Sequence, residues 1–170
     1  MAKDKSAKIK TPRLQTQTDL SDNAVPEIAD ALNGLLADAF ALYMKTKNFH
    51  WHVSGSHFRD YHLLFDEQAA EIYASTDELA ERVRKLGART IHSISEISKR
   101  QSIKDNDKDF VAPADMLKEL MEDNKTVIKA MRKAHDIADK HEDVATASIL
   151  ENFIDQAEKR NWFLFEASRV

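Results

Sequence analysis

The chain has 170 residues, enough for one domain with a hydrophobic core, and 42% of them are hydrophobic and 32% charged. Only three Gly and three Pro interrupt it, which favours a helical globular protein. The lack of cysteine excludes disulfides, Cys-ligated zinc and thiol catalysis. The sequence has no apolar run of transmembrane length and no signal-peptide core, so we expect a cytoplasmic protein that does not contact membranes.

The net charge of −4 conceals a basic N-terminus on an acidic body. Residues 1–13 carry five basic side chains and one acidic side chain, a net charge of +4, which leaves 20 basic and 28 acidic residues, a net charge of −8, on the remainder. This composition predicts a flexible basic tail, placed at residues 1–20, that binds DNA phosphates without sequence preference; the alternative is a solubilising terminus. The residues expected to contact DNA are Lys3, Lys5, Lys8, Lys10 and Arg13.

Helical periodicity accounts for the rest of the chain, residues 21–170. Short turns within two helix pairs and a long connection between the pairs predict an all-α, ferritin-like four-helix bundle with a short extra helix in the crossover. The expected helices cover residues 26–53 and 58–86, a short piece around 91–97, and two helices that begin near residues 113 and 143.

The second long helix carries four residues of metal-ligand types in a spacing that one chain cannot use. His62 and Asp66 are four residues apart, as are Asp77 and Glu81, so all four lie on one stripe of the helix. The two pairs are separated by about 16 Å along the helix, too far for one metal ion. A second copy of the helix laid antiparallel, with a twofold axis near residues 71–72, brings the pairs together and creates two identical sites per dimer.

His50 joins this set because the apolar stripe of the first helix, continued, directs it inward. Two imidazoles and three carboxylates are typical of non-haem Fe(II), although these ligand types leave Zn²⁺, Co²⁺ and Mn²⁺ open. The alternative is that these histidines and acids simply form solvated or salt-bridged helix faces. For any one of these residues alone this alternative is the commoner explanation, but the set as a whole makes it weaker. No histidine has Glu three residues before it, which disfavours a Glu-x-x-His site inside a single bundle.

The segment His50-Trp-His-Val-x-Gly-x-x-Phe58, followed by His62-x3-Asp66 and Asp77-Glu-Leu-Ala-Glu-Arg82, resembles the Dps family, the DNA-binding proteins from starved cells or mini-ferritins. The resemblance covers roughly residues 20–168. It implies a hollow shell of twelve subunits built from twofold dimers, and oxidation of two Fe(II) ions per intersubunit site, preferably by hydrogen peroxide. The residues that it implies as metal ligands and catalytic residues of this ferroxidase centre are His50, His62, Asp66, Asp77 and Glu81.

The resemblance also implies roles for residues around the centre. Trp51, beside a ligand, is a candidate electron source for stray oxidising equivalents, and the plainer interpretation is a packing aromatic. Acidic pores near the start of the last helix admit iron in the family, and the candidates here are Asp139, Glu142 and Asp143.

Two alternatives to a DNA-binding ferroxidase that stores iron stay open. One is a structural protein that coats DNA and carries an incidental metal site. The other is a mini-ferritin that does not bind DNA. If the protein does bind DNA, we expect it to associate with the nucleoid.

Overall fold

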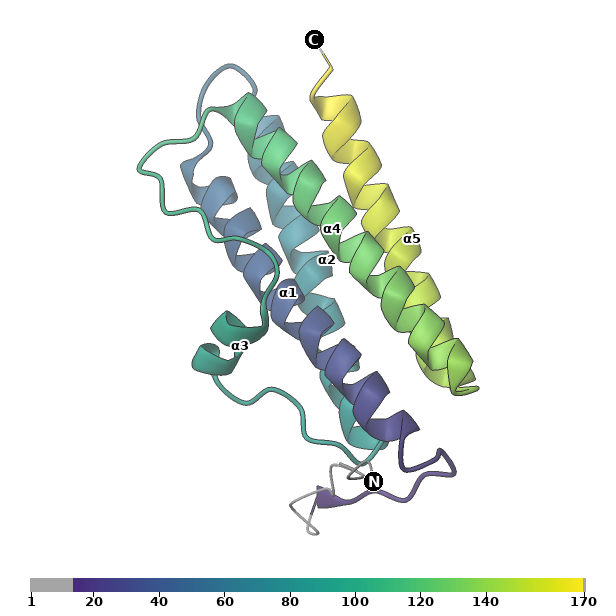
Figure 1. The fold of residues 1–170 in the computed structure, drawn as a ribbon. Coiled ribbons are helices and arrows are strands. Elements are labelled where there is room, and N and C mark those ends of the chain that lie inside the picture. Colours follow the sequence, from purple (N-terminus) through teal and green to yellow (C-terminus); the bar gives the residue numbers. More distant parts are fainter. Residues whose placement is uncertain (1–13, 170) are drawn as a thin grey trace, which may run out of the picture.

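The computed structural model describes residues 14–169, which form five helices and no strand. The helices are α1 (Ala24–His52), α2 (Phe58–Lys85), α3 (Ile94–Arg100), α4 (Pro113–Lys140) and α5 (Val144–Ala167). Figure 1 shows α1 and α2 as one antiparallel pair, α4 and α5 as another, and α3 in the long crossover beside α1. This is the predicted four-helix bundle with one crossover and a short extra helix.

The basic residues expected to bind DNA lie outside the described residues, in the segment 1–13. Within residues 14–169, no helix is both long enough and apolar enough to cross a membrane.

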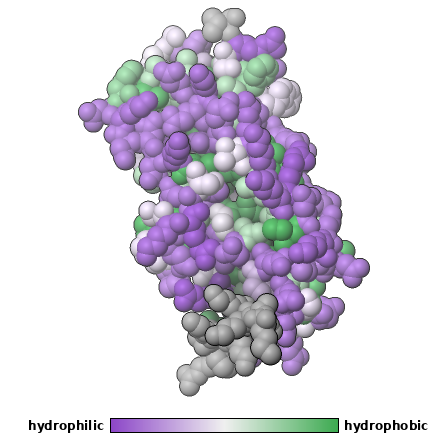
Figure 2. All heavy atoms as spheres, in the orientation of Figure 1, coloured by the Kyte–Doolittle hydropathy of each residue, from purple (hydrophilic) through white to green (hydrophobic). Residues whose placement is uncertain are grey.

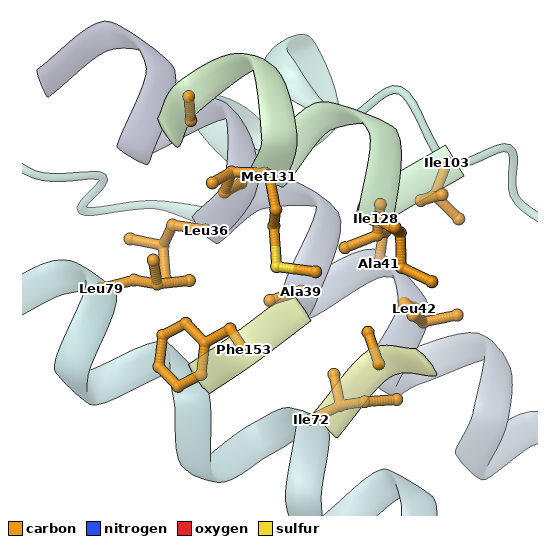
Figure 3. Close-up of a cluster of buried hydrophobic side chains, with 14 of the residues drawn as sticks. Leu36, Ala39, Ala41, Leu42, Ile72, Leu79, Ile103, Ile128, Met131 and Phe153 are labelled. Atoms are coloured by element: carbon orange, nitrogen blue, oxygen red, sulfur yellow. The ribbon is translucent and has the colours of Figure 1, made fainter. Parts of the chain in front are cut away.

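Apolar side chains from all four long helices meet in one core, part of which is drawn in Figure 3. Leu36 of α1 and Leu79 of α2 are 2% and 3% exposed, and Met131 of α4 and Phe153 of α5 lie beside them. Burial of apolar surface contributes about 25 cal/mol per Å² and is the main force that holds the helices together. It also fixes the rotation of α1 and α2 about their axes, and therefore decides which polar residues face outward.

Two helix boundaries differ from those expected from the sequence. The first helix begins at Ala24, two residues before Pro26, because a proline in the first turn lacks only an N–H that has no partner within the helix. The short helix begins at Ile94, three residues later than expected. Ser93 caps it, and its hydroxyl oxygen accepts a hydrogen bond from the backbone nitrogen of Glu96 at 3.3 Å.

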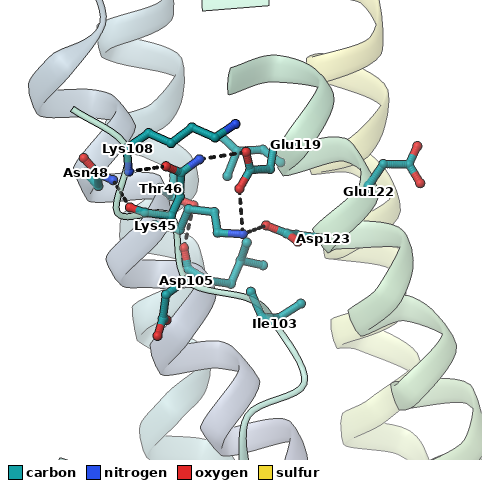
Figure 4. A network of polar contacts seen from close by, with 12 residues as sticks. Lys45, Thr46, Asn48, Ile103, Asp105, Lys108, Glu119, Glu122 and Asp123 are labelled. Atoms are coloured by element: carbon teal, nitrogen blue, oxygen red, sulfur yellow. Dashed lines mark hydrogen bonds and ion pairs between the residues drawn. The ribbon is translucent and has the colours of Figure 1, made fainter. Parts of the chain in front are cut away.

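A buried lysine joins α1, α4 and the crossover (Figure 4). The Lys45 side chain is 3% exposed, and its Nζ lies 2.7 Å from Asp123 and 3.0 Å from Glu119, both on α4. Asn106 of the crossover donates to Glu119 at 2.9 Å, and Asn48 of α1 donates to the carbonyl oxygen of Asn106 at 3.3 Å. Burial raises the pKa of the Asp123 carboxyl despite the nearby ammonium. The network therefore depends on Lys45 for its charge balance.

Lys45→Met should lower the free energy of unfolding at neutral pH by about 3 kcal/mol, because two partly buried carboxylates lose their cation. The loss should be smaller near pH 4. Without Lys45 the pKa of the Asp123 carboxyl rises further. The stability of the variant is therefore closest to that of the parent at low pH, where Asp123 is protonated, and it falls as pH increases and the carboxyl ionises. Urea unfolding followed by circular dichroism measures both. Lys125→Met, which removes an exposed lysine paired with Glu122, is the control and should unfold like the parent protein.

Candidate metal centre

His50 and His62 hold each other across the turn between α1 and α2. His50 lies in the last turn of α1 and is buried, and His62 lies in the second turn of α2. Nδ1 of His50 donates to the carbonyl oxygen of His62 at 2.7 Å, and Nδ1 of His62 donates to the carbonyl oxygen of His50 at 2.8 Å. The rings are stacked, with centroids 3.8 Å apart. Because a carbonyl oxygen only accepts, each ring carries its proton on Nδ1 and keeps a lone pair on Nε2 for a metal ion.

Asp66 is the carboxylate next to this pair. Its Oδ1 lies 3.8 Å from Nε2 of His50 and 2.7 Å from Nζ of Lys47. The hydrogen bond from Lys47 holds the pKa of the Asp66 carboxyl below its usual value. The Asp66 side chain is 53% exposed, so the ion pair is weak and an incoming metal ion can displace the ammonium. We refer to His50, His62 and Asp66 as the first half-site.

Lys47 is the residue of this site that sequence reasoning missed. It lies three residues before His50 and four before Trp51 on α1, so the three side chains share one side of the helix. Nζ of Lys47 lies 5.8 Å from the ring centroid of Trp51, which is 55% exposed and is therefore not a core residue of its own subunit. The spacing on α1 was visible in the sequence, whereas the partner Asp66 lies on another helix.

Asp77 and Glu81 form the second half-site, toward the other end of α2. Both are exposed, and Oε2 of Glu81 lies 3.4 Å from Nζ of Lys85 in the next turn. Asp77 is eleven residues beyond Asp66, about 16 Å along the helix. Within residues 14–169, no cluster of three or more histidine and acidic side chains is arranged to hold a metal ion. The structure thus keeps the two half-sites of one subunit apart.

The face of α2 that carries both half-sites points away from the bundle. Its exposed middle consists of the small residues Ala70 and Ala74 and of Tyr73, which is 54% exposed and packs on Tyr43 of α1. Figure 2 has the orientation of Figure 1, in which α2 lies behind α1 and α4, so it shows the other side of the bundle, where hydrophilic side chains surround smaller apolar patches. Small and apolar residues between two charged ends suit close packing against another helix. Further exposed apolar residues of α1 and α2 are Met44, Trp51, Phe58 and Leu63.

The guanidinium group of Arg160 places a positive charge inside the bundle. The Arg160 side chain is 9% exposed; its Nη1 donates to Glu71 of α2 at 3.0 Å, and its Nε donates to Asn124 of α4 at 3.2 Å. Burial lowers the pKa of the Arg160 guanidinium despite the hydrogen bond to Glu71. Di-iron sites inside ferritin-like bundles use inward carboxylates and histidines. A guanidinium in this position repels metal ions, in agreement with the expectation that a bundle-internal site is disfavoured.

Of the three acidic residues expected at a pore, Asp139 and Glu142 are exposed, whereas Asp143 is 4% exposed. The Asp143 carboxylate accepts hydrogen bonds from Arg82 at 2.6 Å and from the backbone nitrogen of Thr146 at 3.0 Å, which caps α5. The carboxylate oxygens of Asp143 are therefore occupied by hydrogen bonds within the subunit. The pairing was not visible in the sequence because 61 residues separate the partners.

Comparison with known proteins places this geometry in a family. Residues 29–167 match the model of the ferritin-like domain. The DNA protection during starvation protein of Helicobacter pylori is 32% identical over 135 residues, which cover 79% of this chain and 94% of that protein. The protein of the same name from Brevibacillus brevis is 34% identical over 137 residues, which cover 81% and 91%. The chain belongs to the Dps family.

The fold agrees with this membership. The crystal structure of the Dps protein from Vibrio cholerae superposes with a TM-score of 0.86 at 28% identity, over 92% of this chain and 98% of that chain. That protein is described as a member of a broad superfamily of ferritin-like diiron-carboxylate proteins. Both the predicted family and the predicted fold class are thus confirmed, and the roles of individual residues rest on the geometry above.

Lys47→Met should strengthen binding of Co²⁺, a spectroscopic substitute for Fe(II), about two- to fivefold at pH 7, because the metal no longer competes with an ammonium for Asp66. The acid limit of binding should move to higher pH, since the pKa of Asp66 returns toward its ordinary value. Visible absorption during Co²⁺ titration measures both effects. Lys125→Met removes a comparable exposed pair on α4 and should bind as the parent does. Unchanged affinity in Lys47→Met would show that the ammonium does not compete with the metal.

Proposed function

We propose that the protein is a ferroxidase that oxidises Fe(II) at a di-iron site between two subunits and stores the ferric product. The observation that carries the proposal is the division of the ligands along α2. The first half-site offers two Nε2 lone pairs and a carboxylate, and the second half-site, about 16 Å away, offers two more carboxylates. Neither half-site alone provides enough ligands for two ions, and together they do.

An antiparallel pairing of α2 with its copy supplies the missing half. The first half-site of one subunit then faces the second half-site of its partner, and the twofold axis produces two such sites. The small residues Ala70 and Ala74 near the centre of α2 support a close approach of the two helices. By analogy with the Dps family, these dimers assemble into a hollow shell of twelve subunits.

The reaction balances with hydrogen peroxide as the oxidant. Two Fe(II) ions lose one electron each, and the peroxide O–O bond takes both electrons and yields two hydroxide ions. Neutral imidazoles bind Fe(II), and the three carboxylates stabilise the harder Fe(III) product. Delivery of both electrons at one site avoids the hydroxyl radical that a one-electron step would release, so oxidation also protects DNA.

Three further groups complete the proposal. Trp51 is an exposed aromatic beside the first half-site and serves as an electron source for stray oxidising equivalents. Asp139 and Glu142, the exposed acids of the α4–α5 turn, line the iron-entry pore. The basic arm, residues 1–13, binds DNA phosphates, which places the protein on the nucleoid in the cytoplasm.

Subunit mixing tests the shared site. His62→Ala and Glu81→Ala should each abolish fast Fe(II) oxidation, because each removes a ligand from every site. When the two variants are unfolded together and refolded, half of the dimers are mixed and one of their two sites keeps every ligand. About a quarter of the parent activity should return. Stopped-flow absorbance of ferric iron after addition of peroxide measures the rate.

Glu78→Gln, an exposed change on α2 outside both half-sites, is the control and should keep full activity. Sedimentation must show assemblies well above the 19.4 kDa of one chain. Absence of any recovery in well-mixed assemblies would overturn the intersubunit site. Full activity of both single variants would instead favour the interpretation of these residues as a salt-bridged surface.

Deletion of residues 1–13 should sharply weaken DNA binding and leave Fe(II) oxidation unchanged, because a charge of +4 is removed from a body with a net charge of −8. In the parent, five phosphate contacts per engaged arm give a slope of log affinity against log salt of about −4 to −5. Gel-shift titrations at two salt concentrations compare the two proteins. Equal binding would show that the arm is only a solubilising terminus.

A further inference from the structure

A second basic region lies within the acidic body. Residues 82–100, here called the basic collar, carry six basic side chains and one acidic side chain, a net charge of +5. The other residues from 14 to 170 then carry 14 basic and 27 acidic side chains, a net charge of −13. The collar runs from the last turn of α2 to the end of α3. The molecule therefore concentrates positive charge in one continuous segment outside the arm.

The start of the described chain is held at this collar. Nη2 of Arg84 donates to the carbonyl oxygen of Leu14 at 2.7 Å, and the Thr16 hydroxyl donates to the carbonyl oxygen of Arg84 at 3.0 Å. Thr16 also covers Gly87, where a Cβ would lie 2.9 Å from the Thr16 carbonyl oxygen. Gly87 has a φ of +84°, so glycine is required there both for the backbone conformation and for the close approach. Leu14, the first residue that the structure describes, is thus held on the collar, and Figure 1 shows the start of the coloured chain near the end of α2.

The collar charges are available to a ligand. The side chains of Lys85 and Arg89 are 56% and 59% exposed, and Lys99 is also exposed. The ion pair of Arg89 with Glu96 is long, at 3.7 Å, and weak in solvent. Arg84 donates to backbone carbonyl oxygens and not to a carboxylate. Arg82 and Arg100 are the exceptions, since their guanidinium groups pair with Asp143 at 2.6 Å and with Asp30 at 2.9 Å.

We propose that the basic collar is a binding surface for the phosphodiester backbone of DNA. Arg89 and Lys99 contact phosphates directly, and Arg84 with Gly87 holds the base of the arm beside them. The inference rests on the DNA binding proposed above and extends it from the arm to the folded body. A fixed attachment point keeps the arm at high effective concentration over the phosphates that the collar binds.

The collar variant Arg89→Gln/Lys99→Gln tests the direct contacts. Its matched control is Arg132→Gln/Lys133→Gln on α4, which also removes one arginine paired with a glutamate and one exposed lysine. The two variants change the net charge equally. Loss of two phosphate contacts per engaged subunit should flatten the slope of log affinity against log salt by about 1.8, and weaken binding at about 0.1 M salt by tenfold or more. The control should keep the parent slope in fluorescence-anisotropy titrations with a duplex probe.

Failure of this inference and failure of the proposed DNA binding are distinguishable. Equal slopes for the collar variant and its control, with a loss of binding on deletion of residues 1–13, would overturn the collar alone. Unchanged binding in both the collar variant and the deletion variant would overturn both the collar and the arm as DNA-binding surfaces, whereas absence of binding by the parent protein would overturn the DNA-binding function itself.

Gly87→Ala tests the anchoring of the arm. Its control is Gly55→Ala, where φ is +105° but nothing lies within 4 Å of the added Cβ. Hydrogen exchange at residues 15–18 should accelerate in Gly87→Ala and not in Gly55→Ala. Release of this segment lengthens the tether from 13 to about 19 residues, which should weaken DNA binding about twofold per engaged arm. Unchanged exchange in Gly87→Ala, or faster exchange with parent DNA affinity, would overturn the role of the anchor.

Discussion

The reciprocal hydrogen bonds between His50 and His62 are the constraint on which the rest of the site depends. Each imidazole donates through Nδ1 to the other residue's carbonyl oxygen, so ring orientation and backbone turn are fixed together. Each such hydrogen bond contributes about 1 kcal/mol to stability. The larger consequence is chemical, since both rings are held as the tautomer that leaves Nε2 unprotonated. Binding of a metal ion then requires no change of tautomer in either ring.

Lysine side chains balance the negative charge of two half-site carboxylates. Asp66 pairs with Lys47 and Glu81 pairs with Lys85, both in exposed positions. Taken alone, these pairs fit an ordinary salt-bridged surface. Their position favours a metal centre, because the carboxylates lie at the two ends of an outward face whose middle is small and apolar. A twofold copy would bring the ends together, and metal ions would replace the ammonium groups.

The helices and the bundle topology could be predicted because they depend on periodicity along the chain. The same periodicity places His62, Asp66, Asp77 and Glu81 along one side of α2, and their role as metal ligands stays a prediction. The start of α3 could not be predicted, because Ser93 is one of several serines that could cap a helix there. Ion pairs between residues of different elements could not be predicted from the sequence either, as the pair of Arg82 with Asp143 shows. Spacing within an element says which residues share a face, and only packing says what that face meets. The hydrogen bond from Arg84 of α2 to Leu14 likewise joins distant parts of the chain and could not be predicted from spacing.

The most direct test of the account is anomalous X-ray diffraction from crystals loaded with Co²⁺, recorded on both sides of the cobalt edge. A shared centre predicts two groups of anomalous peaks per dimer, with up to two Co²⁺ ions in each, between the imidazole nitrogens of one subunit and the Asp77 and Glu81 carboxylates of the other. A metal ion bound by residues of one chain alone, or peaks confined to the bundle interior near Arg160, would contradict it.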